Sequence, residues 1–109
     1  MLNDLLNIFT FSPDIRTINI PSYSKIIDGK RYTTDGAKLL AGNKLWHNRW
    51  GLIFKTPNGN YFELVQFDSP EYDIHPYGSE RIAMQRFEHA KQQLVSHEEA
   101  FPQVIIADA

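Results

Sequence analysis

Alternating apolar and polar positions in the middle of the chain predict antiparallel strands. Two runs rich in aromatic and branched residues flank residues 56–59, Thr-Pro-Asn-Gly, an order typical of the turn that closes a β-hairpin. In the first run Trp50, Leu52 and Phe54 fall on one side and Ile53 on the other. Both faces of this hairpin are therefore apolar, which predicts the central pair of a sheet.

A second hairpin is predicted over residues 24–32. Asp28 and Gly29 lie between two β-prone runs, and both residues tolerate the positive φ that the central positions of a type I′ turn require. Upstream, residues 17–20 alternate and are β-prone, and Pro21 ends that run. We assign residues 1–21 to an N-terminal extension and residues 22–67 to the two hairpins with the segment that joins them.

Two helices and one further strand are predicted from residue spacing and from the residues at the ends of each segment. Residues 33–43 predict a short helix, with a Thr cap and with Gly42 and Asn43 as its stop. Residues 79–96 predict the main helix, because Ser79 suits an N-cap and apolar residues then recur at helical intervals. Residues 101–106 predict an edge strand with Pro near its start.

These elements predict one α+β domain spanning residues 1–109. Its core is a small antiparallel sheet of two β-hairpins, on which the short helix and the longer C-terminal helix pack. A length of 109 residues with 42% hydrophobic and 13% aromatic residues is enough for one hydrophobic core.

The composition narrows the classes of protein to consider. Without cysteine the chain has no disulfides, no Cys-based zinc site and no thiol nucleophile. The first nine residues lack the basic start and long apolar stretch of a secretory signal, and they are too short to span a membrane. We therefore expect a cytoplasmic protein without membrane contact.

The residues that commonly carry catalysis form no recognised motif. The four histidines have no metal-ligand spacing, and neither a phosphate-binding loop nor a nucleophile elbow is present. Residues 68–75 gather three carboxylates and His75, a set that suits weak cation binding, acid–base chemistry or a solvated loop. We assign no catalytic residue, no metal site and no cofactor.

Charge is unevenly distributed along the chain. Residues 16–55 contain eight Lys and Arg and two Asp, a net charge of +6, whereas residues 56–109 contain three basic and nine acidic residues, a net charge of −6. The basic half includes a segment in which cations alternate with tryptophans, a composition used by protein hot spots and by nucleic-acid grooves. Trp50 is better explained as core, and the candidate partner-binding residues are Lys30, Arg31, Lys44, Trp46, His47 and Arg49.

Two segments resemble a group of small bacterial and phage proteins. The first is a hairpin followed by Tyr-x-Thr-x-x-Ala, here Tyr32, Thr34 and Ala37. The second is (Lys/Arg)-Thr-x-x-Gly-x-(Tyr/Phe)-Phe, here residues 55–62, preceded by Ile53 where the pattern usually has Leu. With an Ile-x-Pro at residues 74–76, the resemblance covers about residues 24–95. It supports the fold, and its phage and plasmid setting implies an inhibitor of a nucleic-acid-targeting host defence complex, of the anti-CRISPR type.

The leading hypothesis is therefore a non-enzymatic module that binds a protein, plausibly a host defence effector. One alternative is direct nucleic-acid binding through residues 25–55, and another is a small acid–base enzyme that uses Asp73 and His75. A homodimer could form through the apolar N-terminal segment or through Val104 and Ile106.

Overall fold

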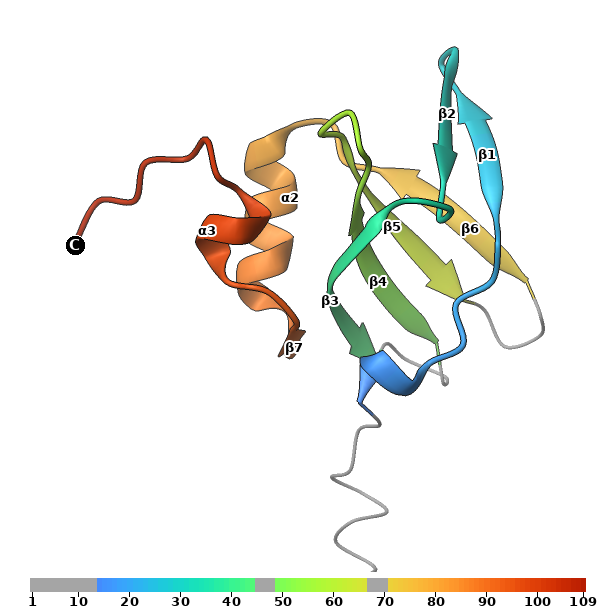
Figure 1. The fold of residues 1–109 in the computed structure, drawn as a ribbon, viewed down its shortest axis with the longest axis horizontal. Helices are drawn as coiled ribbons and strands as arrows, with labels where there is room; N and C mark the ends of the chain where they lie inside the picture. Colours follow the sequence, from blue (N-terminus) through green and yellow to red (C-terminus); the bar gives the residue numbers. More distant parts are fainter. Residues whose placement is uncertain (1–13, 45–48, 67–70) are drawn as a thin grey trace, which may run out of the picture.

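Antiparallel strands make up most of the protein. The computed structural model describes residues 14–44, 49–66 and 71–109. A two-stranded hairpin, β1–β2, stands beside a five-stranded sheet of order β6-β5-β4-β3-β7, and two short helices lie at the opposite side of that sheet (Figure 1). The elements in chain order are a 3₁₀ turn (Ile15–Thr17), β1 (Ser24–Ile27), β2 (Lys30–Thr33), β3 (Lys38–Lys44), β4 (Trp50–Lys55), β5 (Tyr61–Gln66), β6 (Tyr72–Pro76), α2 (Glu80–His89), β7 (Gln92–Gln93) and α3 (His97–Ala100).

Both predicted hairpins are confirmed. Asp28 and Gly29 have φ angles of 51° and 77°, as a type I′ turn requires, and they join β1 to β2. In the β4–β5 turn, Gly59 has φ of 86° and donates its N–H to the carbonyl of Thr56 at 2.9 Å. The Asn60 N–H donates to the Thr56 hydroxyl at 3.0 Å, so this turn is held by its own polar groups.

The central pair β4–β5 carries apolar side chains on both faces, as predicted. On one face Leu52 and Phe54 are buried with Phe62, whose ring stacks on that of Phe54 at 5.2 Å. The hairpin β1–β2 covers this face through Tyr32, and the segment before it contributes the fully buried Ile15. Residues 14–21 of the predicted extension therefore pack on the sheet, while residues 1–13 lie outside the described residues.

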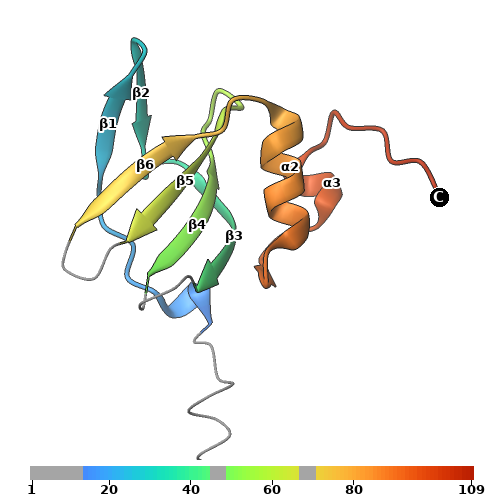
Figure 2. The same ribbon diagram turned by 180° about the vertical axis from the view of Figure 1, so that it is seen from behind.

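The two helices cover the opposite face of the sheet. Ile53 and Tyr61 are buried there against Phe87 of α2, and Phe101 follows directly after α3. The Phe101 ring stacks on Tyr61 at 4.9 Å and meets Phe87 edge-on at 5.5 Å. The five-stranded sheet thus separates two apolar clusters, one under the hairpin and one under the helices (Figures 1 and 2).

The prediction of a short helix over residues 33–43 is wrong, because β3 occupies this segment from Lys38. The Thr34 hydroxyl, which resembled a helix cap, instead donates to the Pro21 carbonyl at 2.7 Å and accepts the Tyr23 N–H. The apolar residues of β3 serve both faces of the sheet, since Leu39 contacts the cluster under the hairpin and Leu40 the cluster under the helices. A bulge between Leu39 and Ala41 shifts the register.

The predicted main helix over residues 79–96 is shorter in the structure. Ser79 caps α2 as predicted, since its hydroxyl accepts the Ile82 N–H at 3.2 Å, but α2 ends at His89. The following residues form β7 against β3, and the Leu94 N–H donates to the Leu40 carbonyl at 2.8 Å. Pairing with the open edge of β3 therefore replaces the last two turns of the expected helix.

Two other segments also differ from expectation. Residues 101–106 form no strand: the chain turns after the buried Phe101 and then leaves the domain, and Ile105 is 93% exposed (Figure 2). Part of the predicted acidic loop is β6, which pairs with β5 at the edge of the sheet. Antiparallel strands with short helices are consistent with the predicted α+β class. The finer arrangement differs, because the chain forms a five-stranded sheet beside a separate hairpin, and helices α2 and α3 both follow the sheet strands β3–β6 in sequence.

Candidate functional site

Two hollows lie on either side of β2, near the tips of the two hairpins. Their volumes are about 510 Å³ and 450 Å³, within the usual range of ligand pockets. Lys30, Tyr32 and Asn60 line both hollows, so the two form one continuous feature, which we call the β2 cleft.

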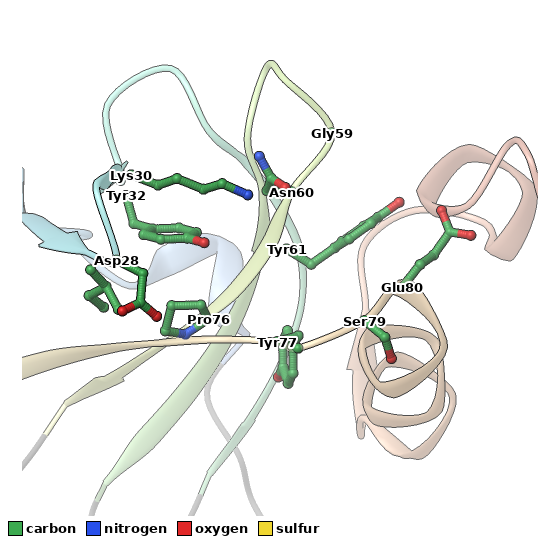
Figure 3. Close-up of a pocket in the computed structure, with 12 residues that line it drawn as sticks. Asp28, Lys30, Tyr32, Gly59, Asn60, Tyr61, Pro76, Tyr77, Ser79 and Glu80 are labelled. Carbon is green, nitrogen blue, oxygen red and sulfur yellow. The ribbon is translucent and has the colours of Figure 1, made fainter.

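The first hollow lies between the β1–β2 hairpin and the link from β6 to α2. Ile27, Pro76 and Tyr77 give it apolar walls, and Asp28 and Glu80 add carboxylates at its rim. Figure 3 shows that the Lys30 side chain runs toward Asn60, above the ring of Tyr32. The second hollow lies between residues 31–35 and the β4–β5 turn.

Local structure fixes the walls of the β2 cleft. Tyr32 is buried and its ring meets Phe62 edge-on at 6.0 Å, which ties β2 to the sheet. Because side chains alternate along a strand, Lys30 shares the inner face with Tyr32, whereas Arg31 points outward. Burial raises the pKa of the Tyr77 phenol, so this wall residue stays neutral well above physiological pH.

The two cations of the cleft are exposed and unpaired. Lys30 and Arg31 form no ion pair with the residues that the structure describes. Other cations of the basic half are engaged: Lys25 binds Asp73 at 2.7 Å and Lys38 binds Glu99 at 2.5 Å. Folding therefore neutralises part of the basic half and leaves positive charge at the tip of β2.

The structure divides the predicted partner-binding residues between two places. Lys30 and Arg31 lie at the β2 cleft, whereas Lys44 ends β3 and Arg49 precedes β4 at the far end of the sheet. The six residues of β4 separate these ends by about 17 Å, at roughly 3.4 Å per residue. Trp46 and His47 lie outside the described residues, so the structure brings together only the first pair.

Asp73 and His75 are adjacent on β6, outside both hollows. Asp73 accepts from Lys25 at 2.7 Å, from the Ile74 N–H at 2.9 Å and from His75 Nε2 at 3.1 Å. The hydrogen bond from Lys25 is the main cause that lowers the pKa of Asp73 and raises that of Lys25. The Asp73 carboxylate thus accepts three hydrogen bonds, and the one from Lys25 joins β1 to β6.

The other two histidines that the structure describes also have structural partners. His89 Nδ1 lies 2.8 Å from the Gln85 carbonyl within α2, and His97 Nε2 lies 2.9 Å from Glu88. Within residues 14–44, 49–66 and 71–109, no group of three or more His, Asp or Glu is placed to hold a metal ion. None of the helices described there is long and apolar enough to cross a membrane.

Sequence reasoning identified both turns but missed the cleft between them. Tyr32, Asn60 and the link of residues 76–80 were not candidates, because nothing in their spacing indicates that they meet. The available signal was indirect: the two segments that resemble the bacterial and phage proteins each contribute one wall of the second hollow.

Comparison of the chain with protein-family models, with curated proteins and with solved structures gives no match.

Proposed function

We propose that this protein is a non-enzymatic binding module that contacts a partner protein at the β2 cleft. The observation that carries this proposal is the position of Lys30 and Arg31 beside two adjoining hollows, since both cations are exposed and form no ion pair within the part of the chain that the structure describes. Apolar walls supply area that a partner can bury, and the unpaired cations supply charge that a partner can neutralise.

The rigidity of the cleft favours binding. Tyr32 is anchored on Phe62, and the β4–β5 turn is held by hydrogen bonds between Thr56 and Asn60. A surface that is already ordered loses little conformational entropy when it binds.

The same charges make nucleic-acid binding the second candidate. Affinity for nucleic acid depends on the number of phosphates that cations contact, and Lys25 and Lys38 are engaged with carboxylates. The exposed cation Lys30 lies near the tip of the β1–β2 hairpin, whereas Lys44 ends β3 and lines neither hollow. These features favour a protein partner.

We propose further that the partner belongs to a host defence complex that targets nucleic acids. This part of the proposal is supported by the resemblance of residues 24–95 to small phage and bacterial proteins. An inhibitor of this type acts by covering a functional surface, which requires an exposed, preformed contact site and no catalytic residue.

Affinity capture from a lysate of the host bacterium tests the proposal, with mass spectrometry as the readout. Lys30→Glu and Arg31→Glu should each lose the captured protein. The matched control Lys91→Glu reverses an exposed charge that lines neither hollow and should retain it. Equal capture by all variants, or none above background with the unaltered protein, would contradict the proposal.

A second measurement separates the two candidate functions. Fluorescence anisotropy with single- and double-stranded DNA and RNA should show no binding at physiological salt. Binding that weakens steeply as salt rises, and that Lys30→Glu and Lys44→Glu both reduce, would favour the nucleic-acid function.

A further inference from the structure

The outer edge of β2 has unpaired backbone groups. Next to the turn, Ile27 and Lys30 form a hydrogen-bonded pair, and at the other end the Thr34 N–H donates to the Tyr23 carbonyl at 3.0 Å. Hydrogen-bonded and non-hydrogen-bonded pairs alternate along an antiparallel ladder. The N–H and C=O groups of Arg31 and Thr33 therefore point away from β1.

This edge faces the second hollow. Arg31 and Thr33 line it from one side, and the β4–β5 turn lines it from the other. Among the residues that the structure describes, no strand pairs with this side of β2. The hollow thus gives an extended chain access to an open strand edge.

The outer edge of β6, by contrast, has fewer free donors. The Tyr77 N–H donates to the Tyr61 carbonyl, so the same alternation turns the backbone of Tyr72, Ile74 and Pro76 outward. Pro76 has no N–H, and the Asp73 carboxylate already accepts the N–H of Ile74. Two of the three outward positions of β6 therefore lack a free N–H, whereas Arg31 and Thr33 of β2 both keep theirs.

Charge at the open edge indicates what would bind it. Lys30 lies on the inner face of β2 and Arg31 on the outer face, so cations flank both sides of any added strand. Asp35 also lines the second hollow, but Ser22 donates a hydrogen bond to it at 2.8 Å. Acidic side chains on an added strand would meet an unpaired cation on either face.

We propose that the β2 edge binds an extended, acidic segment of the partner protein by β-strand addition, an inference that rests on the proposed function. Residues of the segment opposite Arg31 and Thr33 would exchange main-chain hydrogen bonds with β2, and their neighbours would place side chains in the second hollow.

The first experiment uses a short capped peptide of alternating glutamate and valine as the probe. Titration followed by amide NMR should shift the signals of Arg31 and Thr33 and slow their hydrogen exchange, and leave those of Ser24 and Ile26 unchanged. A peptide of the same length with lysine in place of glutamate should cause no shift. Absence of any change at millimolar glutamate peptide, or changes confined to β6, would overturn the inference.

The second experiment removes one main-chain donor from either edge of the same hairpin. Thr33 and Ser24 are opposite each other, and their N–H groups point to opposite edges. Thr33→Pro should weaken peptide binding about tenfold, whereas Ser24→Pro should leave it within about twofold. Circular dichroism checks that both variants fold, and Lys30→Glu, which keeps the backbone intact, provides a test that does not depend on proline.

The outcomes distinguish the inference from the proposed function. If Lys30→Glu abolishes both partner capture and peptide binding but Thr33→Pro changes neither, the cleft binds through side chains and strand addition is wrong. If the captured partner is insensitive to every variant in the cleft, the proposed function fails as well. A concentration-dependent doubling of mass in light scattering that Thr33→Pro abolishes would instead identify a second copy as the occupant.

Discussion

Gly42 leaves room in the core for the side chains of Leu52 and Ile15, and it gives a sharp test of the fold. It lies in β3, opposite Leu52 of β4 and Gln92 of β7. A Cβ atom at this position would lie 2.7 Å from Leu52 Cδ2 and 3.2 Å from two carbon atoms of Ile15. Because carbon atoms pack at about 3.5–4.0 Å, Gly42→Ala must displace Leu52 by roughly 1 Å.

The cost of that displacement follows from how tightly the neighbours are held. Leu52 is 3% exposed and Ile15 is completely buried, so neither side chain can move into solvent. Overpacking of this kind costs about 1–3 kcal/mol, and the lower chain entropy of unfolded alanine offsets about 0.4–1 kcal/mol. We expect Gly42→Ala to lower the free energy of unfolding by about 1–2 kcal/mol and the Tm by about 4 °C or more.

Urea unfolding followed by tryptophan fluorescence measures this change, with an unchanged m-value as evidence that the unfolded state is the same. Gly78→Ala is the matched control, since a Cβ there meets nothing within 4 Å and its φ is not positive. It should be neutral or stabilise by up to about 1 kcal/mol. In a Leu52→Val background the cost of Gly42→Ala should fall by about 0.5 kcal/mol or more. Equal stability of Gly42→Ala and the unaltered protein, or purely additive effects with Leu52→Val, would refute the packing argument.

Three further predictions concern other parts of the fold. Phe101→Ala removes a fully buried ring that contacts Tyr61 and Phe87, and should cost about 3–5 kcal/mol in urea unfolding, whereas the exposed Pro102→Ala should change stability by less than about 0.5 kcal/mol. The hydrogen bond from Lys25 is the main cause that lowers the pKa of Asp73. The stability that Asp73 contributes is therefore complete above the ordinary carboxyl pKa of 3.8 and is lost as pH falls through the lowered pKa. Asp73→Asn should flatten the acidic part of the plot of Tm against pH. Burial raises the pKa of Tyr77, so the stability that Tyr77 contributes is complete below the ordinary phenol pKa of 10.0 and is lost as pH rises above it. Tyr77→Phe should flatten the alkaline part of the plot of Tm against pH. An unaltered alkaline part would exclude Tyr77 as the cause of the loss of stability.

The elements that the sequence predicted correctly are those whose signals are local. The Asp28–Gly29 turn depends on positive φ at two adjacent residues, and the cap of α2 on one hydroxyl, Ser79. The faces of β4 follow from strict alternation over six residues. Each of these features is determined within a few positions of the chain.

The incorrect predictions involve segments whose partners are distant in sequence. Residues 38–44 have helical spacing, but both faces of that segment are buried because Leu39 and Leu40 meet different clusters. Residues 90–94 continue the spacing of α2, yet the edge of β3 offers backbone hydrogen bonds to Gln92 and Leu94. Tertiary pairing overrides local propensity at both places.

The candidate site could be predicted only in part for the same reason. Lys30 and Arg31 follow from charge and turn position, but the β2 cleft exists because two turns about 30 residues apart lie side by side. Lys44 and Arg49 were grouped with them through proximity in the basic segment, and the length of β4 separates them.

The opposite charges of the two halves of the chain also favour the β2 cleft as the proposed contact site. Lys25 and Lys38 pair with Asp73 and Glu99, residues more than 45 positions away, so two cations of the basic half contact carboxylates of the acidic half. Solvent screens ion pairs at such exposed positions, so their main effect is to orient these elements. At the tip of β2 the chain provides no carboxylate for Lys30 or Arg31 among its described residues, although Asp28 and Asp35 lie close in sequence. A charge that folding leaves unpaired beside a hollow and an open strand edge is available to a partner, and this combination is why we propose the β2 cleft as the contact site.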